Sequence, residues 1–150
     1  MHNKKKQPAI ARLEKNLKQF QIKKNIIQDS YNVAEKLWKM NMKSLALDLL
    51  RKLEEISRKE NTLAEVFFKS YREELQHFYE GEFKDSKLLK INHSLSETPL
   101  FTYFQEILYN KISSGETFEE VLKKSPYNRF STFRVLYNFK LEGFLELSLE

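Results

Sequence analysis

The sequence predicts an all-α protein: a long amino-terminal helix, a helical hairpin, and a compact three-helix unit that ends in a short strand. Three observations favour this class. Among 150 residues only three are Gly and three are Pro, which is few for a turn-rich β protein. Apolar residues recur at helical spacing along most of the chain. Hydrophobic residues make up 41% and charged residues 31%, as expected for a packed core with a solvated surface.

The first 40 residues carry a heptad seam, in which apolar or near-apolar residues alternate at spacings of three and four. Its members are Ile10, Leu13, Leu17, Phe20, Ile27, Tyr31, Ala34 and Trp38, and Lys24 fills the one slot without an apolar residue. The pattern predicts one helix from about Pro8 to Met40, with Pro8 in its first turn, where a missing N–H costs nothing. A break near Asn25, giving two helices, is the alternative.

Capping signals predict the next two helices. Asn41 to Ser44 form a turn, and Ser44 caps a helix with an apolar stripe. The stripe consists of Leu45, Leu49, Leu53 and Ile56, with Leu50 beside it. Thr62 and Glu65 form a capping box for a helix that ends near Glu80, with Gly81 in the left-handed position after it. The side chains expected inside are those of Val66, Phe67, Tyr71, Leu75 and Phe78.

Residues 84–98 are turn-prone and are predicted as a linker, with a helical turn around Leu88, Leu89 and Ile91. The domains expected are therefore 1–83 and 99–150. In the second domain, Thr98-Pro99 begins a helix that Ser114-Gly115 ends, and Thr117 with Glu120 forms a capping box. Ser125-Pro126 begins the last helix, which Gly143 ends. Alternation of Leu145, Leu147 and Leu149 predicts a strand.

Positive charge is concentrated at the amino terminus. Residues 1–25 hold eight cations and one anion, Glu14, whereas the rest of the chain has a net charge of −2. The candidate residues for binding nucleic acid or an acidic partner are Lys4, Lys5, Lys6, Arg12, Lys15, Lys18 and Lys23. On the other side of the same helix, Ile10, Leu13, Leu17 and Phe20 fall within an arc of about 80° and are the candidate protein interface. A lysine-rich face that is merely solvated is the alternative.

Two segments resemble known families. Residues 31–56 resemble one tetratricopeptide repeat, with small Ala34 and Ala46 twelve residues apart and Asn41 in the turn. Residues 101–149 resemble a degenerate winged-helix module of the kind that accompanies bacterial PATAN-type signalling domains. This second resemblance rests on Ile112–Leu122 and on Val135 to Leu147 with Gly143. It implies a protein of bacterial regulation, and such modules often contact proteins without reading DNA.

The last helix is a poor candidate for reading DNA bases. Asn128, Arg129 and Thr132 lie in its amino-terminal part, from which recognition helices contact bases. However, residues 99–150 hold six cations and seven anions, which provides little electrostatic attraction for DNA. If the chain binds nucleic acid, we therefore expect it to do so through the basic amino terminus and not through this unit.

No catalytic pattern is present in the sequence. The chain has no Cys, and His2, His77 and His93 have no second ligand at metal-like spacing. The three glycines have capping roles, so no phosphate-binding loop is expected. Without a signal peptide or a run of 18 apolar residues, the expected location is the cytoplasm. We therefore expect a non-enzyme without cofactor or metal, an interaction or adaptor module that binds another protein or itself. Nucleic-acid binding is the alternative, and membrane binding is not favoured.

Overall fold

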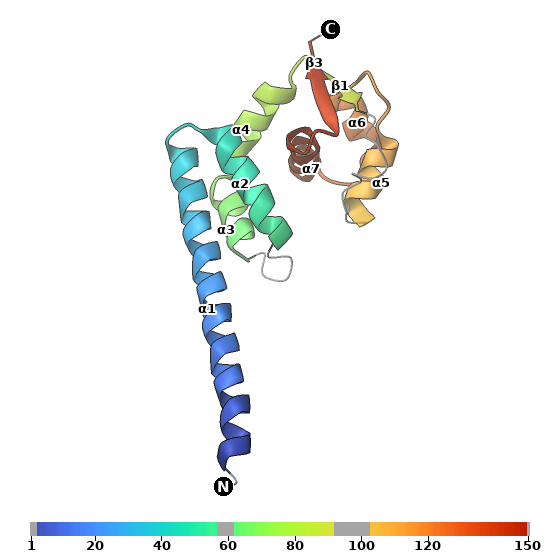
Figure 1. Ribbon diagram of the computed structural model, residues 1–150. Helices are drawn as coiled ribbons and strands as arrows, with labels where there is room; N and C mark the ends of the chain where they lie inside the picture. The colour runs from blue at the N-terminus through green and yellow to red at the C-terminus, as the bar shows by residue number, and fades with distance from the viewer. Residues whose placement is uncertain (1–2, 57–61, 92–102, 150) are drawn as a thin grey trace. The chain divides into compact units, whose positions relative to one another are not determined.

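The computed structural model describes residues 3–56, 62–91 and 103–149, without the side chains of residues 3–8, Phe20, Ile22 and Thr62. Within these ranges the chain forms seven helices and three short strands, which confirms the predicted, mostly helical class (Figure 1). The chain divides into two compact units, residues 1–69 and 70–150. The segment predicted as a linker, residues 84–98, contains a strand that belongs to the second of these units.

Unit 1 is built on one long helix. Helix α1 (Asn3–Lys39) spans 37 residues, without a break at Asn25. It begins earlier than predicted, so Pro8 lies beyond its first turn. An interior proline removes one backbone hydrogen bond and crowds the carbonyl of the preceding turn, yet α1 continues through Pro8.

A hairpin joins α1 to α2 (Lys43–Ile56). Asn41, in the turn between the two helices, adopts the left-handed conformation (φ 63°), which asparagine tolerates better than most residues. Ala34 and Ala46 are both fully buried, as expected of small residues that let two helices approach closely. The helix starts at Lys43, so Ser44 lies in its first turn and is not the residue before it.

The buried stripe of α2 differs from the predicted one. Leu45 and Ile56 are each 59% exposed, so half of the predicted stripe is at the surface. The buried side chains are those of Ala46, Leu47, Leu50 and Leu53. Compared with the prediction, the buried stripe is turned around the helix by about one residue.

Helix α3 (Thr62–Ser70) completes the core of unit 1. The Phe67 ring meets Trp38 edge to face at 5.8 Å, and Phe68 is also buried, whereas Val66 is 56% exposed. The predicted helix to Glu80 is interrupted at Tyr71, next to the boundary between the units. The hydroxyl of Thr62 is outside the described atoms, and so is the capping box predicted there.

Unit 2 begins with α4 (Arg72–Phe83). Gly81 lies inside this helix and does not end it, and Asp85 takes the left-handed conformation after it (φ 59°). The strand β1 (Lys87–Lys90) follows, where a helical turn was predicted. Its Leu88 is fully buried, and β1 is the central strand of a sheet with the order β2-β1-β3.

Three helices and two strands complete unit 2. They are α5 (Tyr103–Lys111), β2 (Glu116–Thr117), α6 (Phe118–Lys124), α7 (Arg129–Leu141) and β3 (Leu145–Ser148). Both outer strands pair antiparallel with β1, Leu88 lying opposite Glu116 of β2 and Leu147 of β3. The aromatic and aliphatic side chains of α7 form the centre of the core, with Phe133, Leu136 and Phe139 fully buried.

The capping signals predicted in unit 2 are confirmed in part. Thr117 and Glu120 bond each other's backbone N–H, which confirms the second capping box. Gly115 and Gly143 have the positive φ values, 93° and 84°, that glycine favours. The residue that caps α7 is Asn128, whose side chain accepts a 2.8 Å hydrogen bond from the Ser131 N–H. Ser125, which was predicted in this role, lies at the end of α6.

The strand predicted from the leucine alternation is confirmed as β3. Leu149, the last leucine of the pattern, follows the strand and is 83% exposed. The start predicted at Thr98-Pro99 lies outside the described residues.

Candidate interaction surface

The heptad seam of α1 is buried along one half of the helix and exposed along the other. Tyr31, Ala34 and Trp38 pack against α2 and α3 and are at most 5% exposed. Ile10, Leu13 and Leu17 belong to the same seam but are 53%, 62% and 67% exposed. We call these three residues the exposed seam. Phe20 also belongs to it by sequence, although its side chain is outside the description.

The length of α1 explains this difference. At about 1.5 Å per residue, its 37 residues extend about 55 Å, whereas the 14 residues of α2 extend about 21 Å. Helices α2 and α3 lie along the carboxy-terminal half of α1, and the amino-terminal half extends past both (Figure 1). Consequently, within unit 1 the described part of the chain provides no element to cover the exposed seam.

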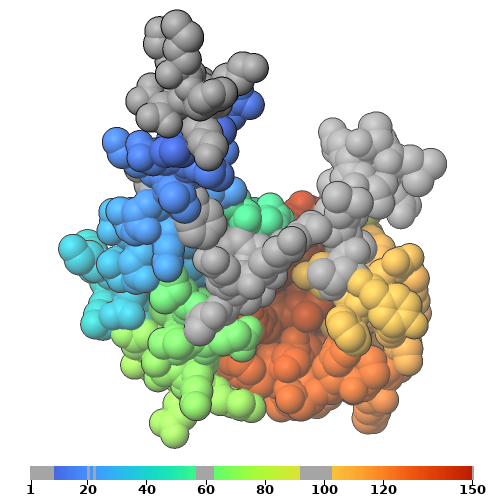
Figure 2. Space-filling view, turned by 90° about the horizontal axis from the view of Figure 1, so that it is seen from below, coloured from blue at the N-terminus to red at the C-terminus, as the bar shows by residue number. Residues whose placement is uncertain are grey.

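The opposite side of the same half-helix is basic. Arg12, Lys15, Lys18 and Lys23, which we call the basic face, are all exposed. All side chains of residues 9–19 are exposed, and the part of this segment that is visible in Figure 2 is blue. Lys4, Lys5 and Lys6 are in the helix, but their side chains are outside the description. Among the described side chains, the exposed seam and the basic face therefore lie on two sides of one helix.

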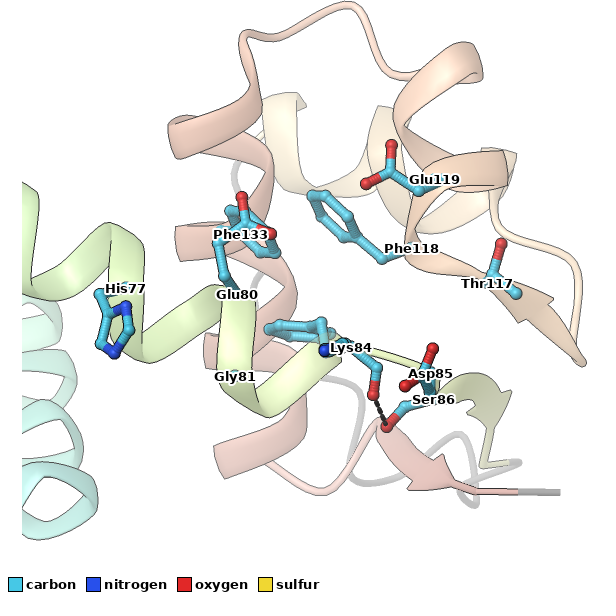
Figure 3. A pocket seen from close by; sticks show the side chains of 11 residues that line it. His77, Glu80, Gly81, Lys84, Asp85, Ser86, Thr117, Phe118, Glu119 and Phe133 are labelled. Atoms are coloured by element: carbon cyan, nitrogen blue, oxygen red, sulfur yellow. Dashed lines mark hydrogen bonds between the residues drawn. The ribbon is translucent and has the colours of Figure 1, made fainter.

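Unit 2 contains a groove of about 490 Å³ between the carboxy-terminal part of α4 and the start of α6 (Figure 3). Phe83, Phe118 and Phe133 form its floor, and the last two rings stack with centroids 3.8 Å apart. All three are less than 5% exposed, so little apolar surface is available to a ligand. Glu80 and Glu119 lie at its edge and face the rings in Figure 3.

Arg129 joins these two carboxylates. Its guanidinium donates to Glu80 at 2.7 and 2.8 Å and to Glu119 at 2.7 and 3.1 Å. It also lies over the rings of Phe118 and Phe133, 5.2 Å from each centroid. The hydrogen bonds from Arg129 lower the pKa of Glu80, and the hydrogen bonds to Glu80 and Glu119 raise the pKa of Arg129.

This Arg129 clamp connects α4, α6 and α7. The sequence offered no signal for it, since Arg129 and Glu80 are 49 residues apart. It also changes the interpretation of Arg129 as a base-reading side chain, because the donors of the guanidinium already bind carboxylates of the same unit.

Other candidate residues do not converge on a reactive centre. His77 lies at the edge of the groove, but its ring points away from the phenylalanine rings in Figure 3. The adjacent Glu119 and Glu120 have separate structural roles, one in the Arg129 clamp and one in the capping box. In the described part of the chain, no group of three or more His, Cys, Asp or Glu is placed to hold a metal ion. His2 and His93 lie outside it.

Among the described helices, none combines the length and apolar character that crossing a bilayer requires. Comparison of the chain with protein-family models, with curated proteins and with solved structures gave no match.

Proposed function

We propose that this chain is a non-enzymatic interaction or adaptor module that binds another protein helix through the exposed seam of α1. The observation that carries the proposal is that one seam has two parts: the residues that pack inside unit 1 are preceded in the same helix, at heptad spacing interrupted only at Lys24, by apolar residues that pack on nothing described in unit 1. A helix with one apolar stripe is stabilised by covering it, and amphipathic helices bind partners in this way.

A pair of matched variants tests the proposal. Leu13→Gln/Leu17→Gln removes the apolar stripe, and Lys15→Gln/Lys18→Gln removes two charges from the other side of the same turns. All four side chains are exposed, and Gln, Leu and Lys have similar helix propensities, so both variants should fold.

The tagged full chain is used for capture from nuclease-treated native lysate. We expect a specific protein to be retained by the wild type and by Lys15→Gln/Lys18→Gln, and lost by Leu13→Gln/Leu17→Gln. Equal retention by all three forms would show that the exposed seam is not the binding surface.

A second candidate, nucleic-acid binding, is favoured by the exposed basic face. Here the expected result is reversed: Lys15→Gln/Lys18→Gln weakens a gel shift, and Leu13→Gln/Leu17→Gln does not. Because such binding releases counterions from the phosphates, it should fall steeply with salt. Absence of a shift at low salt, measured with competitor DNA, would remove this candidate.

We further propose that unit 2 is a degenerate winged-helix unit with a scaffold role. The order α5, α6, α7 and β3 matches the order of the resemblance, with β1 as the central strand. Two features argue against base reading by α7. Arg129 is held in the clamp, and Lys140 pairs with Glu82 of α4 at 3.0 Å.

A further inference from the structure

We propose that the outer edge of β3 pairs with β3 of a second copy of this chain, so that the two sheets join into one. This inference goes beyond the proposed function and uses a different surface, since β3 belongs to unit 2 and the exposed seam belongs to unit 1. It rests on the backbone of an edge strand, on the groove beside that strand, and on the pattern of its side chains.

The backbone of β3 presents hydrogen-bonding groups on its outer side. Among the described strands, β3 pairs with β1 alone. The Ile91 N–H donates to the Phe144 C=O at 3.0 Å, so the backbone groups of Phe144, and by alternation those of Glu146, face β1. The N–H and C=O groups of Leu145 and Leu147 therefore point outward, where no described residue is bonded to them. An edge of this kind is a template for another strand.

A groove of about 520 Å³ lies beside this edge. Leu145, Leu147 and Leu149 line one side of it, and the ends of α4 and α7 contribute Glu82 and Lys140. These two charges pair with each other at 3.0 Å, so together they give the groove no net charge. Peptides that add a strand to a sheet edge place alternate side chains in such grooves. The occupant should therefore be an extended strand with an apolar residue at every second position.

The chain's own β3 is a strand of this kind. Its leucines alternate with Glu146 and Ser148. Leu149 continues the pattern beyond the strand and is 83% exposed. Antiparallel pairing of two copies about a twofold axis brings Leu149 of one copy to the groove beside Leu145 of the other. The second copy therefore supplies the apolar side chain that the groove can cover.

The side chains of β3 select the alignment of the two strands. A twofold axis at Glu146 would set this carboxylate opposite itself, and like charges directly opposite each other are destabilising. An axis at Leu145 would leave Leu149 without a partner strand. An axis at Leu147 sets Leu145 opposite Leu149 of the copy. It also sets Glu146 opposite the small, neutral Ser148, and the outward backbone groups of the leucines exchange hydrogen bonds.

The same alignment brings opposite charges near each other. Within one chain Lys87 of β1 lies opposite Ser148 of β3, and both Lys87 and Glu146 are exposed. In the joined sheet, Glu146 of one copy lies two strands from Lys87 of the other, about 10 Å away on the same face. Because Ser148 lies between them and is small, the two long side chains can approach each other above it. The symmetric arrangement forms this contact twice.

The size of the contact sets its strength. It involves residues 145–149 of each chain, far fewer than the roughly 20–30 residues a side of a standard interface. We therefore expect a weak, concentration-dependent dimer. Sedimentation equilibrium of the full chain over roughly 10 µM to 1 mM covers this affinity range.

A matched pair of variants at Leu149 tests the backbone pairing. Leu149→Ala and Leu149→Pro both remove an exposed leucine that lies beyond the end of β3, so both should fold. Only proline also removes the N–H that donates to Leu145 of the copy. We expect Leu149→Pro to dimerise at least about fivefold more weakly than Leu149→Ala, because a hydrogen bond is lost in each half of the dimer.

A charge variant tests the alignment. Ser148→Glu sets a carboxylate opposite Glu146 of the copy, twice, and should weaken the dimer roughly 3- to 10-fold. The double variant Glu146→Ser/Ser148→Glu exchanges the two residues, so a carboxylate again faces a serine. Its affinity should return to within about twofold of the wild type. Leu13→Gln/Leu17→Gln changes the exposed seam alone and should dimerise as the wild type does.

Each opposite result would overturn the inference. A monomer at every concentration excludes the second copy, and equal affinities of Leu149→Pro and Leu149→Ala exclude backbone pairing. Failure of the double variant to recover excludes the alignment. Loss of the dimer in Leu13→Gln/Leu17→Gln places the contact on α1. The proposed function is decided separately, because capture of another protein through Leu13 and Leu17 does not need β3.

Discussion

Replacing Arg129 by Met tests whether the Arg129 clamp holds unit 2 together. Methionine keeps a flexible apolar side chain over the phenylalanine rings but removes the charge and every donor. The two carboxylates it leaves behind, Glu80 and Glu119, are 42% and 63% exposed and can be hydrated by water. The substitution should therefore weaken unit 2 without leaving a buried charge unpaired.

The expected cost follows from the contacts that are lost. Each ion pair is substantially exposed, so solvent screening limits it to roughly 0.2–1 kcal/mol, with the paired hydrogen bonds to Glu80 favouring the upper end. Stacking on Phe118 and Phe133 adds roughly 0.5–1 kcal/mol. We expect Arg129→Met to lower the free energy of unfolding by about 1.5 kcal/mol.

Urea unfolding at pH 7, followed by far-UV circular dichroism, measures this loss. Arg129→Lys is the matched control: it keeps the charge but cannot bind both carboxylates through a planar fork, so it should recover less than half of the loss. A difference between Arg129→Met and the wild type below about 0.3 kcal/mol would show that the clamp contributes nothing to stability, since solvent can then replace all of its contacts.

The pH dependence has a definite sign. The pKa of Glu80 is lowered below its ordinary 4.5 by the hydrogen bonds from Arg129. The stability that this pair adds is therefore present above pH 4.5 and is lost as the pH falls through the lower, folded-state pKa. The difference between wild type and Arg129→Met should shrink on acidification below that value, and a difference that stays constant would assign the effect to ring stacking alone.

Three further predictions concern single turns and helix faces, each measured by urea unfolding. Asn41→Ala should cost about 1 kcal/mol, because alanine tolerates the left-handed turn less well than asparagine; the fluorescence of Trp38, the one tryptophan, reports on this unit. Ala46→Leu should cost roughly 1–3 kcal/mol by overpacking, whereas Leu45→Ala should change stability by less than about 0.5 kcal/mol. If Leu45→Ala instead cost more stability than Ala46→Leu, the buried stripe of α2 would be the one predicted from the sequence. Asn128→Ala should cost about 1 kcal/mol through the lost cap of α7, and no loss would mean that water replaces it.

The features predicted well from the sequence are those governed by neighbours along the chain. The heptad seam identified α1, because side chains three and four residues apart share a helix face whatever the rest of the fold does. The capping box at Thr117 and the turns at Gly115 and Gly143 depend on a few adjacent residues, and all three are present. That Leu13 and Lys15 lie on different sides of α1 follows from the same local spacing.

The features missed depend on contacts between distant segments. The strand β1 is short, and its Leu88 and Leu89 favour a strand no more than a helix; pairing with β3, almost 60 residues later, decides the matter. The residues on either side of β1 are polar and turn-prone, so local pattern alone predicts a linker there and gives no sign of the strand. The Arg129 clamp forms between residues that local spacing does not relate.

Exposure divides the α1 seam into two parts with different consequences for a mutation. Truncating Trp38, which is 2% exposed, removes packing inside unit 1 and must lower its stability. Truncating Leu17, which is 67% exposed, removes almost no packing in the single chain, so folding alone gives no reason for a large apolar residue there. A stability scan combined with a binding measurement therefore separates the two parts: positions 31–38 should affect unfolding, and positions 10–17 should affect association. If Leu17→Gln destabilised the monomer as strongly as Trp38→Ala, the first half of the seam would be packed within the chain and the proposed surface would not exist.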